Sequence, residues 1–195
     1  MKLSVVMTVA LLLSFSAMAF AQGAADTLFQ VRYAANLTFS DTLIDVTNTG
    51  ANSTQISPQN GNICVNVYGL TGPTLIHCCS CFVKPDQLVS LSVQKDLLAN
   101  NNFPPDSMVI KLISTLGTTL ASSCSAHLVG DGNHPIVGGM AAWGTVSQPL
   151  SPNSQAGNAT ETPFTPSTLS AGELASLDSH CTAALGAGTI CNSCK

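Results

Sequence analysis

Charged residues are scarce in this chain, at 8% of its 195 residues, against about 25% in a typical soluble domain. A surface with so few charges must be built largely from Ser, Thr, Asn and Gln. One of the six basic residues is Lys2, and the others are scattered along the chain at Arg32, Lys84, Lys95, Lys111 and Lys195. Nucleic acids and anionic membrane surfaces both bind to clustered positive charge. The composition therefore predicts no nucleic-acid partner and no binding to anionic membranes.

Long apolar runs are missing after the first 21 residues. Residues 1–21 combine Lys2, an apolar stretch and an A-x-A pattern that ends at Ala21, which is typical of a cleaved bacterial secretory signal. Thr8 and Ser14 interrupt the stretch before it reaches the about 20 consecutive apolar residues of a membrane span. We therefore expect a signal peptide over residues 1–21, a mature chain that begins at Gln22, and no stable membrane insertion after cleavage. The protein would be periplasmic, secreted or bound at the cell surface.

Catalytic motifs are also missing. The chain contains no G-x-S-x-G elbow, no H-E-x-x-H pair and no phosphate-binding loop. Its histidines are His77, His127, His134 and His180, and none belongs to a recognisable catalytic pattern. The sequence accordingly predicts no enzyme activity, no catalytic residue, no cofactor and no metal ligand.

Two features leave room for ligand binding. The stretch from Val129 to Gly139 has the Asp, Asn and Gly content of a calcium loop, but it lacks the regular carboxylate spacing and the closing Glu of an EF-hand. A glycine-rich surface loop is the favoured interpretation. Trp143, the one tryptophan, could stack on a sugar ring, although its position on an apolar strand favours a place in the core.

In several stretches of the chain, apolar residues recur at every second position, which is typical of β-strands with one buried face. This pattern predicts strands within residues 27–39 and 41–48, a hairpin over 63–83 with its turn at Gly69–Pro73, and further strands at 87–93 and 108–113. Weaker strands are expected at 124–129 and 140–146. We expect a β-sandwich domain over residues 22–148, followed by a Pro/Ser/Asn-rich extended loop over 149–169.

The C-terminal part changes to a helical period. Ser170 precedes Glu173 by three residues, which is the pattern of a capping box, and Leu174, Leu177 and Cys181 follow at helical spacing. These signals predict a helix over residues 171–185, within a C-terminal segment 170–195 that includes a cysteine-containing tail. The fold class predicted is mainly β: an antiparallel β-sandwich, Ig-like in general architecture, with a C-terminal α-helix stapled by disulfides.

The cysteines are even in number, and all eight are disulfide candidates: Cys64, Cys78, Cys79, Cys81, Cys124, Cys181, Cys191 and Cys194. Disulfides are the default after export, but eight cysteines allow 105 connectivities. A hairpin symmetric about Thr71 would place Cys64 opposite Cys78 or Cys79. Five of the cysteines lie in the β-rich part and three in the C-terminal segment. One disulfide within the β-rich part would leave three cysteines there, which could pair with the three in the C-terminal segment. We therefore expect a bond from Cys78, Cys79 or Cys81 to Cys181, Cys191 or Cys194.

Zinc is the alternative use of these cysteines. Cys78-x-x-Cys81 and Cys191-x-x-Cys194 have ligand spacing, and Cys124-x-x-His127 could complete a tetrahedral site. The expected oxidising compartment favours disulfides over this arrangement.

The stretches DTLIDVTNTG, ICVNVYGL and CCSC are similar to those of uncharacterised secreted, cysteine-containing bacterial β-sandwich proteins. The resemblance covers about the middle third of the chain. It implies export and disulfide stabilisation, and it carries over no activity and no functional residue. We expect a structural or interaction module of the cell surface or extracellular space, whose partner is an extracellular protein or a glycan. The alternative is a small-molecule, carbohydrate or metal-binding domain that uses the loop Asp131–Gly139 and Trp143.

Overall fold

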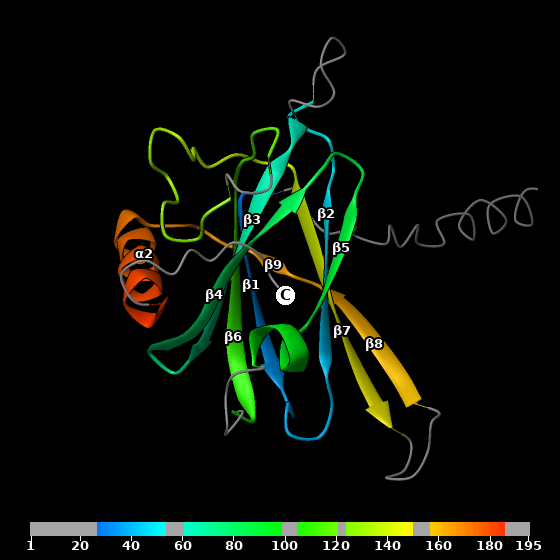
Figure 1. The fold of residues 1–195 in the computed structure, drawn as a ribbon. Helices are drawn as coiled ribbons and strands as arrows, with labels where there is room; N and C mark the ends of the chain where they lie inside the picture. The colour runs from blue at the N-terminus through cyan, green and yellow to red at the C-terminus, as the bar shows by residue number, and fades with distance from the viewer. Residues whose placement is uncertain (1–26, 54–60, 99–104, 121–123, 150–156, 186–195) are drawn as a thin grey trace, which may run out of the picture.

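The computed structural model describes residues 27–53, 61–98, 105–120, 124–149 and 157–185, so the predicted signal peptide lies outside the described residues. Two antiparallel sheets pack face to face (Figure 1). One has five strands, in the order β4 (Thr74–Val83), β3 (Ile63–Thr71), β6 (Ser107–Leu116), β1 (Phe29–Ala35) and β9 (Thr165–Pro166). The other has four, in the order β5 (Leu88–Ser92), β2 (Thr42–Asn48), β7 (Met140–Pro149) and β8 (Gly157–Pro163). The antiparallel β-sandwich predicted from the sequence is confirmed.

The period of two appears most clearly in β2, where Ile44 and Val46 are buried while Leu43 is exposed. Side chains of alternate residues point to opposite faces of a sheet. The even-numbered residues of β2 therefore face the five-stranded sheet, and the odd-numbered residues face outward. A π-helical turn, η2 (Val93–Leu97), follows β5 and buries Val93 and Leu97 at one end of the sandwich.

β3 is buried on both faces, from Ile63 to Leu70. One face packs on the four-stranded sheet, and the other is covered by the loop that begins at Cys124. The helix α2 (Ala171–Leu185) packs beside this loop, on β4. Tyr68 donates a hydrogen bond of 2.7 Å from its hydroxyl to the carbonyl of Ala126 in this loop. The strand predicted at 124–129 is wrong, because this segment forms turns that are held by side chains rather than by a neighbouring strand.

The hairpin of β3 and β4 is confirmed, but its centre is not Thr71. The turn is formed by Gly72 and Pro73, and Gly72 has a φ of +58°, which favours glycine at the first position of a two-residue turn. A register shift next to Gly69 adds a further offset. Cys64 consequently lies opposite Phe82 and not opposite Cys78 or Cys79, so that expectation is corrected.

The Pro/Ser/Asn-rich segment 149–169 contains β8 and β9 rather than an extended loop alone. β8 is the edge strand of one sheet and β9 the edge strand of the other. The chain crosses between the sheets at Phe164, which is buried and whose N–H donates to the carbonyl of Ala142 at 2.9 Å. The sandwich therefore extends beyond residue 148 as far as Pro166, because an edge strand tolerates the proline that the composition contains.

Helix α2 has the bounds predicted from the sequence, Ala171–Leu185. The Ser170 hydroxyl accepts a hydrogen bond of 3.1 Å from the N–H of Glu173. The Glu173 carboxylate does not return to the helix start but pairs with the Lys111 ammonium on β6 at 2.5 Å. Figure 1 shows α2 beside β4, on the side away from the four-stranded sheet. Within the described ranges, the helices fall short of the length and apolarity needed to cross a bilayer.

Candidate functional site

Two disulfides organise the β-rich part and the helix. Cys64 on β3 bonds to Cys124, with a Cα–Cα distance of 5.4 Å, and this bond holds the loop onto the outer face of the five-stranded sheet. Cys78 on β4 bonds to Cys181 on α2, with a Cα–Cα distance of 5.8 Å. The prediction that a cysteine of the Cys78–Cys81 stretch bonds to the C-terminal segment is confirmed.

The other cysteines bear on the zinc alternative. Cys79 is disulfide-bonded as well, and Cys81 is buried, while Cys191 and Cys194 lie outside the described residues. The zinc set needed thiolates from Cys78 and Cys124, and a sulfur in a disulfide has no thiolate to offer a metal. Disulfides form and persist in oxidising compartments, so the bonds indicate that the chain folds outside a reducing cytoplasm.

The four histidines do not converge on one site. His77 lies on β4, where burial lowers its pKa and the nearby Asp96 carboxylate partly opposes that shift. His127 shares a 2.9 Å hydrogen bond with the hydroxyl of Ser125, and His180 lies on the exposed side of α2. In the described part of the chain, no group of three His, Cys, Asp or Glu side chains is arranged to hold a metal ion.

The loop from Val129 to Gly139 is held together by its own aspartate. The Asp131 carboxylate accepts hydrogen bonds from the N–H groups of Asn133, at 2.9 Å, and His134, at 2.7 Å, and it contacts the His134 ring at 2.8 Å. The hydrogen bond from the His134 side chain is the largest cause of the lowered pKa of Asp131. These contacts, all to Oδ1, hold the loop in shape through its own backbone and His134, which fits the surface-loop interpretation.

Trp143 does not occupy the core position that the sequence favoured. Its neighbour Gly144 faces the five-stranded sheet, because a Cβ added there would overlap the Arg32 side chain. Alternation along β7 therefore turns Trp143 to the outer face, where the indole is half-buried. The register places Trp143 between Asp45 of β2 and Pro163 of β8.

This outer face is mixed in chemistry. Its central row runs across all four strands as Ser90, Asp45, Trp143 and Pro163. The Ser90 hydroxyl donates to the Asp45 carboxylate at 2.5 Å. Leu43 and Leu88 lie on the same face with 38% and 59% of their surfaces exposed. We call this set, with the half-buried Thr47 and Thr145, the Trp143 face.

The structure separates Trp143 from the loop Asp131–Gly139. The loop contacts the other side of the sandwich, since Gly130 lies against Leu174 of α2 and Ile136 bridges to Thr115 of β6. The end of the loop, at Gly138 and Gly139, crosses to β2, where the Thr49 N–H donates to the Gly139 carbonyl. Asp131 and its neighbours therefore lie on the α2 side, away from the outer face that carries Trp143.

The sequence indicated Arg32 only as one of several scattered basic residues and predicted no role for it. In the structure its side chain lies between the sheets and lines a pocket beside β8. The sequence carries no signal for this position, because the apolar residues Phe29, Val31 and Tyr33 alternate with Arg32 and would place it on the polar, outward face.

Comparison with known proteins finds no match to a family model, to a curated protein or to a solved structure.

Proposed function

We propose that this chain is a secreted interaction module that works at the cell surface or in the extracellular space and recognises a glycan through the Trp143 face. Export rests on the signal-like residues 1–21, with a mature start at Gln22. The disulfides Cys64–Cys124 and Cys78–Cys181 support an oxidising destination.

The observation that carries the proposal is the row across the four-stranded sheet with Trp143 at its centre. An indole offers a flat apolar surface and one N–H donor, which suits the C–H face of a sugar ring. The Asp45 carboxylate and the Ser90 hydroxyl lie beside it in the same row, and such groups bond sugar hydroxyls. A sheet face with few charges and exposed Leu43 and Leu88 supports a neutral ligand over a charged one.

The test uses the fact that Trp143 is the sole tryptophan. Its fluorescence in the oxidised mature protein reports directly on the proposed site while neutral oligosaccharides of cell-wall and matrix type are added. We expect saturable quenching or a blue shift with at least one oligosaccharide, because a bound sugar excludes water from the indole.

Two variants complete the test by affinity electrophoresis, which measures glycan binding without indole fluorescence. A gel that contains the glycan should slow the migration of the wild-type protein. Trp143→Ala should abolish this effect of the glycan on migration, and Asp45→Asn should weaken it. Phe39→Ala is the matched control, since Phe39 is an aromatic residue with 84% of its surface exposed but lies in the turn between β1 and β2. Equal binding by wild type and Trp143→Ala would refute the proposal, as would the absence of any spectral response.

A further inference from the structure

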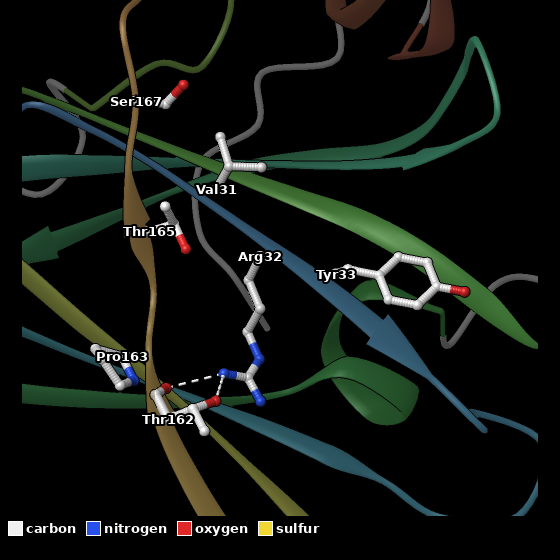
Figure 2. Close-up of a pocket in the computed structure, with 7 residues that line it drawn as sticks. All are labelled: Val31, Arg32, Tyr33, Thr162, Pro163, Thr165 and Ser167. Atoms are coloured by element: carbon white, nitrogen blue, oxygen red, sulfur yellow. Dashed lines mark hydrogen bonds between the residues drawn. The ribbon is translucent and has the colours of Figure 1, made fainter.

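The edge of the five-stranded sheet is left open beside the second half of β1. β9 pairs with β1 only at Gln30 and Val31, because the chain arrives there from the other sheet. In Figure 2 the segment that contains β9 crosses β1 next to Val31, and β1 continues past it to Tyr33. From Arg32 to Ala35, the described part of the chain places no strand on this side of β1. The sheet therefore has an unfilled strand position.

The backbone of β1 directs hydrogen-bonding groups into this position. The carbonyl of Phe29 accepts a hydrogen bond of 3.1 Å from the N–H of Ser167, on the β9 side. Successive residues of a strand direct their N–H and C=O groups to alternate sides. Tyr33 and Ala35 therefore direct theirs to the same side as Phe29, where β9 has ended. A row of edge groups of this kind is a template for a further strand.

A pocket of about 560 Å³ lies at this edge (Figure 2), and we call it the β1 edge pocket. Its lining comes from both faces of β1. Gln30 donates from its side chain to the Met140 carbonyl of β7, so the even-numbered residues, including Arg32, face inward, and Val31 and Tyr33 face outward. An added strand turns alternate side chains to both faces of a sheet. The lining therefore fits an extended peptide better than a compact ligand on one face.

The outer face sets which side chains such a peptide would carry. Tyr33 has 64% of its surface exposed, and a peptide residue opposite it would pack on its ring. Pairs of an aromatic and a β-branched residue across two strands are favourable. The peptide residues opposite Tyr33 and Ala35 would therefore be β-branched and apolar, and the residue between them, opposite Ala34, would point inward.

Arg32 sets the chemistry of the inward-pointing residue. Its Nη1 donates to the carbonyl of Thr162 at 2.8 Å and also to the Thr162 hydroxyl. In Figure 2 the other terminal nitrogen carries no dashed line and points away from Thr162. Neither ion pair among the described residues involves Arg32. A peptide residue opposite Ala34 would lie diagonal to Arg32, at the about 7–8 Å that long side chains span, so a glutamate there would supply the counterion.

We propose that the β1 edge pocket binds an extended segment of a partner protein, antiparallel to β1 and in line with β9, in which a glutamate stands between two β-branched apolar residues. The two apolar residues exchange backbone hydrogen bonds with Tyr33 and Ala35, and the glutamate faces Arg32. A second copy of this chain is a poorer occupant, because its edge strand β8, GNATETP, has no large aliphatic residue and both copies carry a net charge of −4. The site is independent of the Trp143 face, so the two proposals fail separately.

The probe is a fluorescein-labelled peptide Thr-Val-Glu-Val-Thr with blocked ends, whose anisotropy is measured as the oxidised mature protein is added. We expect saturable binding. Methylation of both valine nitrogens removes the N–H groups that face β1 and should weaken binding by about tenfold or more. Methylation of the glutamate nitrogen, which faces away from β1, is the matched control and should change little. Replacement of the glutamate by glutamine should weaken binding about two- to fivefold.

Variants of the protein connect the binding to named residues. Tyr33→Ala should weaken binding up to about fivefold, and Arg32→Gln should abolish the difference between the glutamate and glutamine peptides. Leu120→Ala is the matched control, since Leu120 is exposed to the same 64% but lies after β6. If Arg32→Gln does not fold, the pair of peptides still tests the charge.

Amide hydrogen exchange followed by NMR tests the backbone directly. In the free protein the amides of Tyr33 and Ala35 should exchange faster than that of Ala34, which faces β6, and the peptide should slow both.

Several results would overturn the proposal. They are no saturable binding at millimolar concentrations, equal binding of the valine-methylated peptide, equal binding of the glutamine peptide, the same loss in Leu120→Ala as in Tyr33→Ala, or unchanged exchange at Tyr33 and Ala35. Self-association of the protein that Tyr33→Ala abolishes, measured by sedimentation without peptide, would assign the position to a second copy and would also overturn it.

Discussion

Cys78 and Cys181 are 103 residues apart in the sequence and are joined by a disulfide between β4 and α2. Both side chains are buried, at 1% and 0% exposure. Leu177, one turn before Cys181, is buried too, and the Lys111–Glu173 ion pair connects the first turn of the helix to β6. The helix is therefore attached to the outer face of the five-stranded sheet along its length, by a salt bridge, an apolar contact and a covalent bond.

The first prediction is that this bond contributes strongly to stability. Closing a loop of about 100 residues removes chain entropy from the unfolded state that is worth roughly 4.7 kcal/mol at 25 °C. The double variant Cys78→Ala/Cys181→Ala should lose about 2–5 kcal/mol in free energy of unfolding, measured by denaturant titration without reductant. Thr182→Ala, at an exposed position next to Cys181, is the control and should change little. A decrease in the free energy of unfolding of less than about 0.5 kcal/mol would mean that the ion pair and the apolar contact are sufficient to hold α2 on the sheet.

The second prediction concerns Asp178 on α2. Its Oδ1 atom is buried without a hydrogen-bond partner, and burial raises its pKa above the ordinary 3.8, a shift that His127 opposes and Asp131 reinforces. A raised pKa in the folded state means that the contribution of Asp178 to stability is fully present below pH of about 3.8 and is lost as the pH rises through the folded-state pKa. At neutral pH the charged carboxylate therefore destabilises the fold.

Asp178→Asn should accordingly raise the melting temperature at pH of about 7, and the gain should shrink toward zero as the pH falls below about 3.8. Thermal melts followed by circular dichroism across this range measure both effects. Ser179→Ala, at the exposed neighbouring position, provides the control and should show no such pH dependence. A lower melting temperature for Asp178→Asn at neutral pH would mean that the carboxylate stabilises the helix contact.

The third prediction concerns processing. Signal peptidase reads small residues at the two positions occupied by Ala19 and Ala21, so exported protein should begin at Gln22. Intact mass spectrometry of the exported protein, before and after reduction with thiol labelling, gives the start of the chain and the number of disulfides in one measurement. A fully processed protein that retains Met1 would contradict the export route.

Local patterns in the sequence were sufficient to predict helix α2 and the strands that precede β8. Helix α2 begins and ends where Ser170, Glu173 and the apolar spacing placed it, because capping and helical periodicity involve neighbours along the chain. The strands β1 to β7 follow from alternation for the same reason. β8 could not be predicted, because the composition GNATETP has little strand preference and the segment is ordered by pairing with β7.

The sequence by itself determined that this chain forms a β-sandwich with a C-terminal helix and that cysteines link the two. Tertiary structure alone decided that Cys64 bonds to Cys124, that Trp143 faces outward beside Asp45, and that the Arg32 side chain lies between the sheets. Each of these depends on sheet register and on which strand edges meet. A register offset of one residue moves every side chain to the opposite face, and residues far apart in the chain set that register.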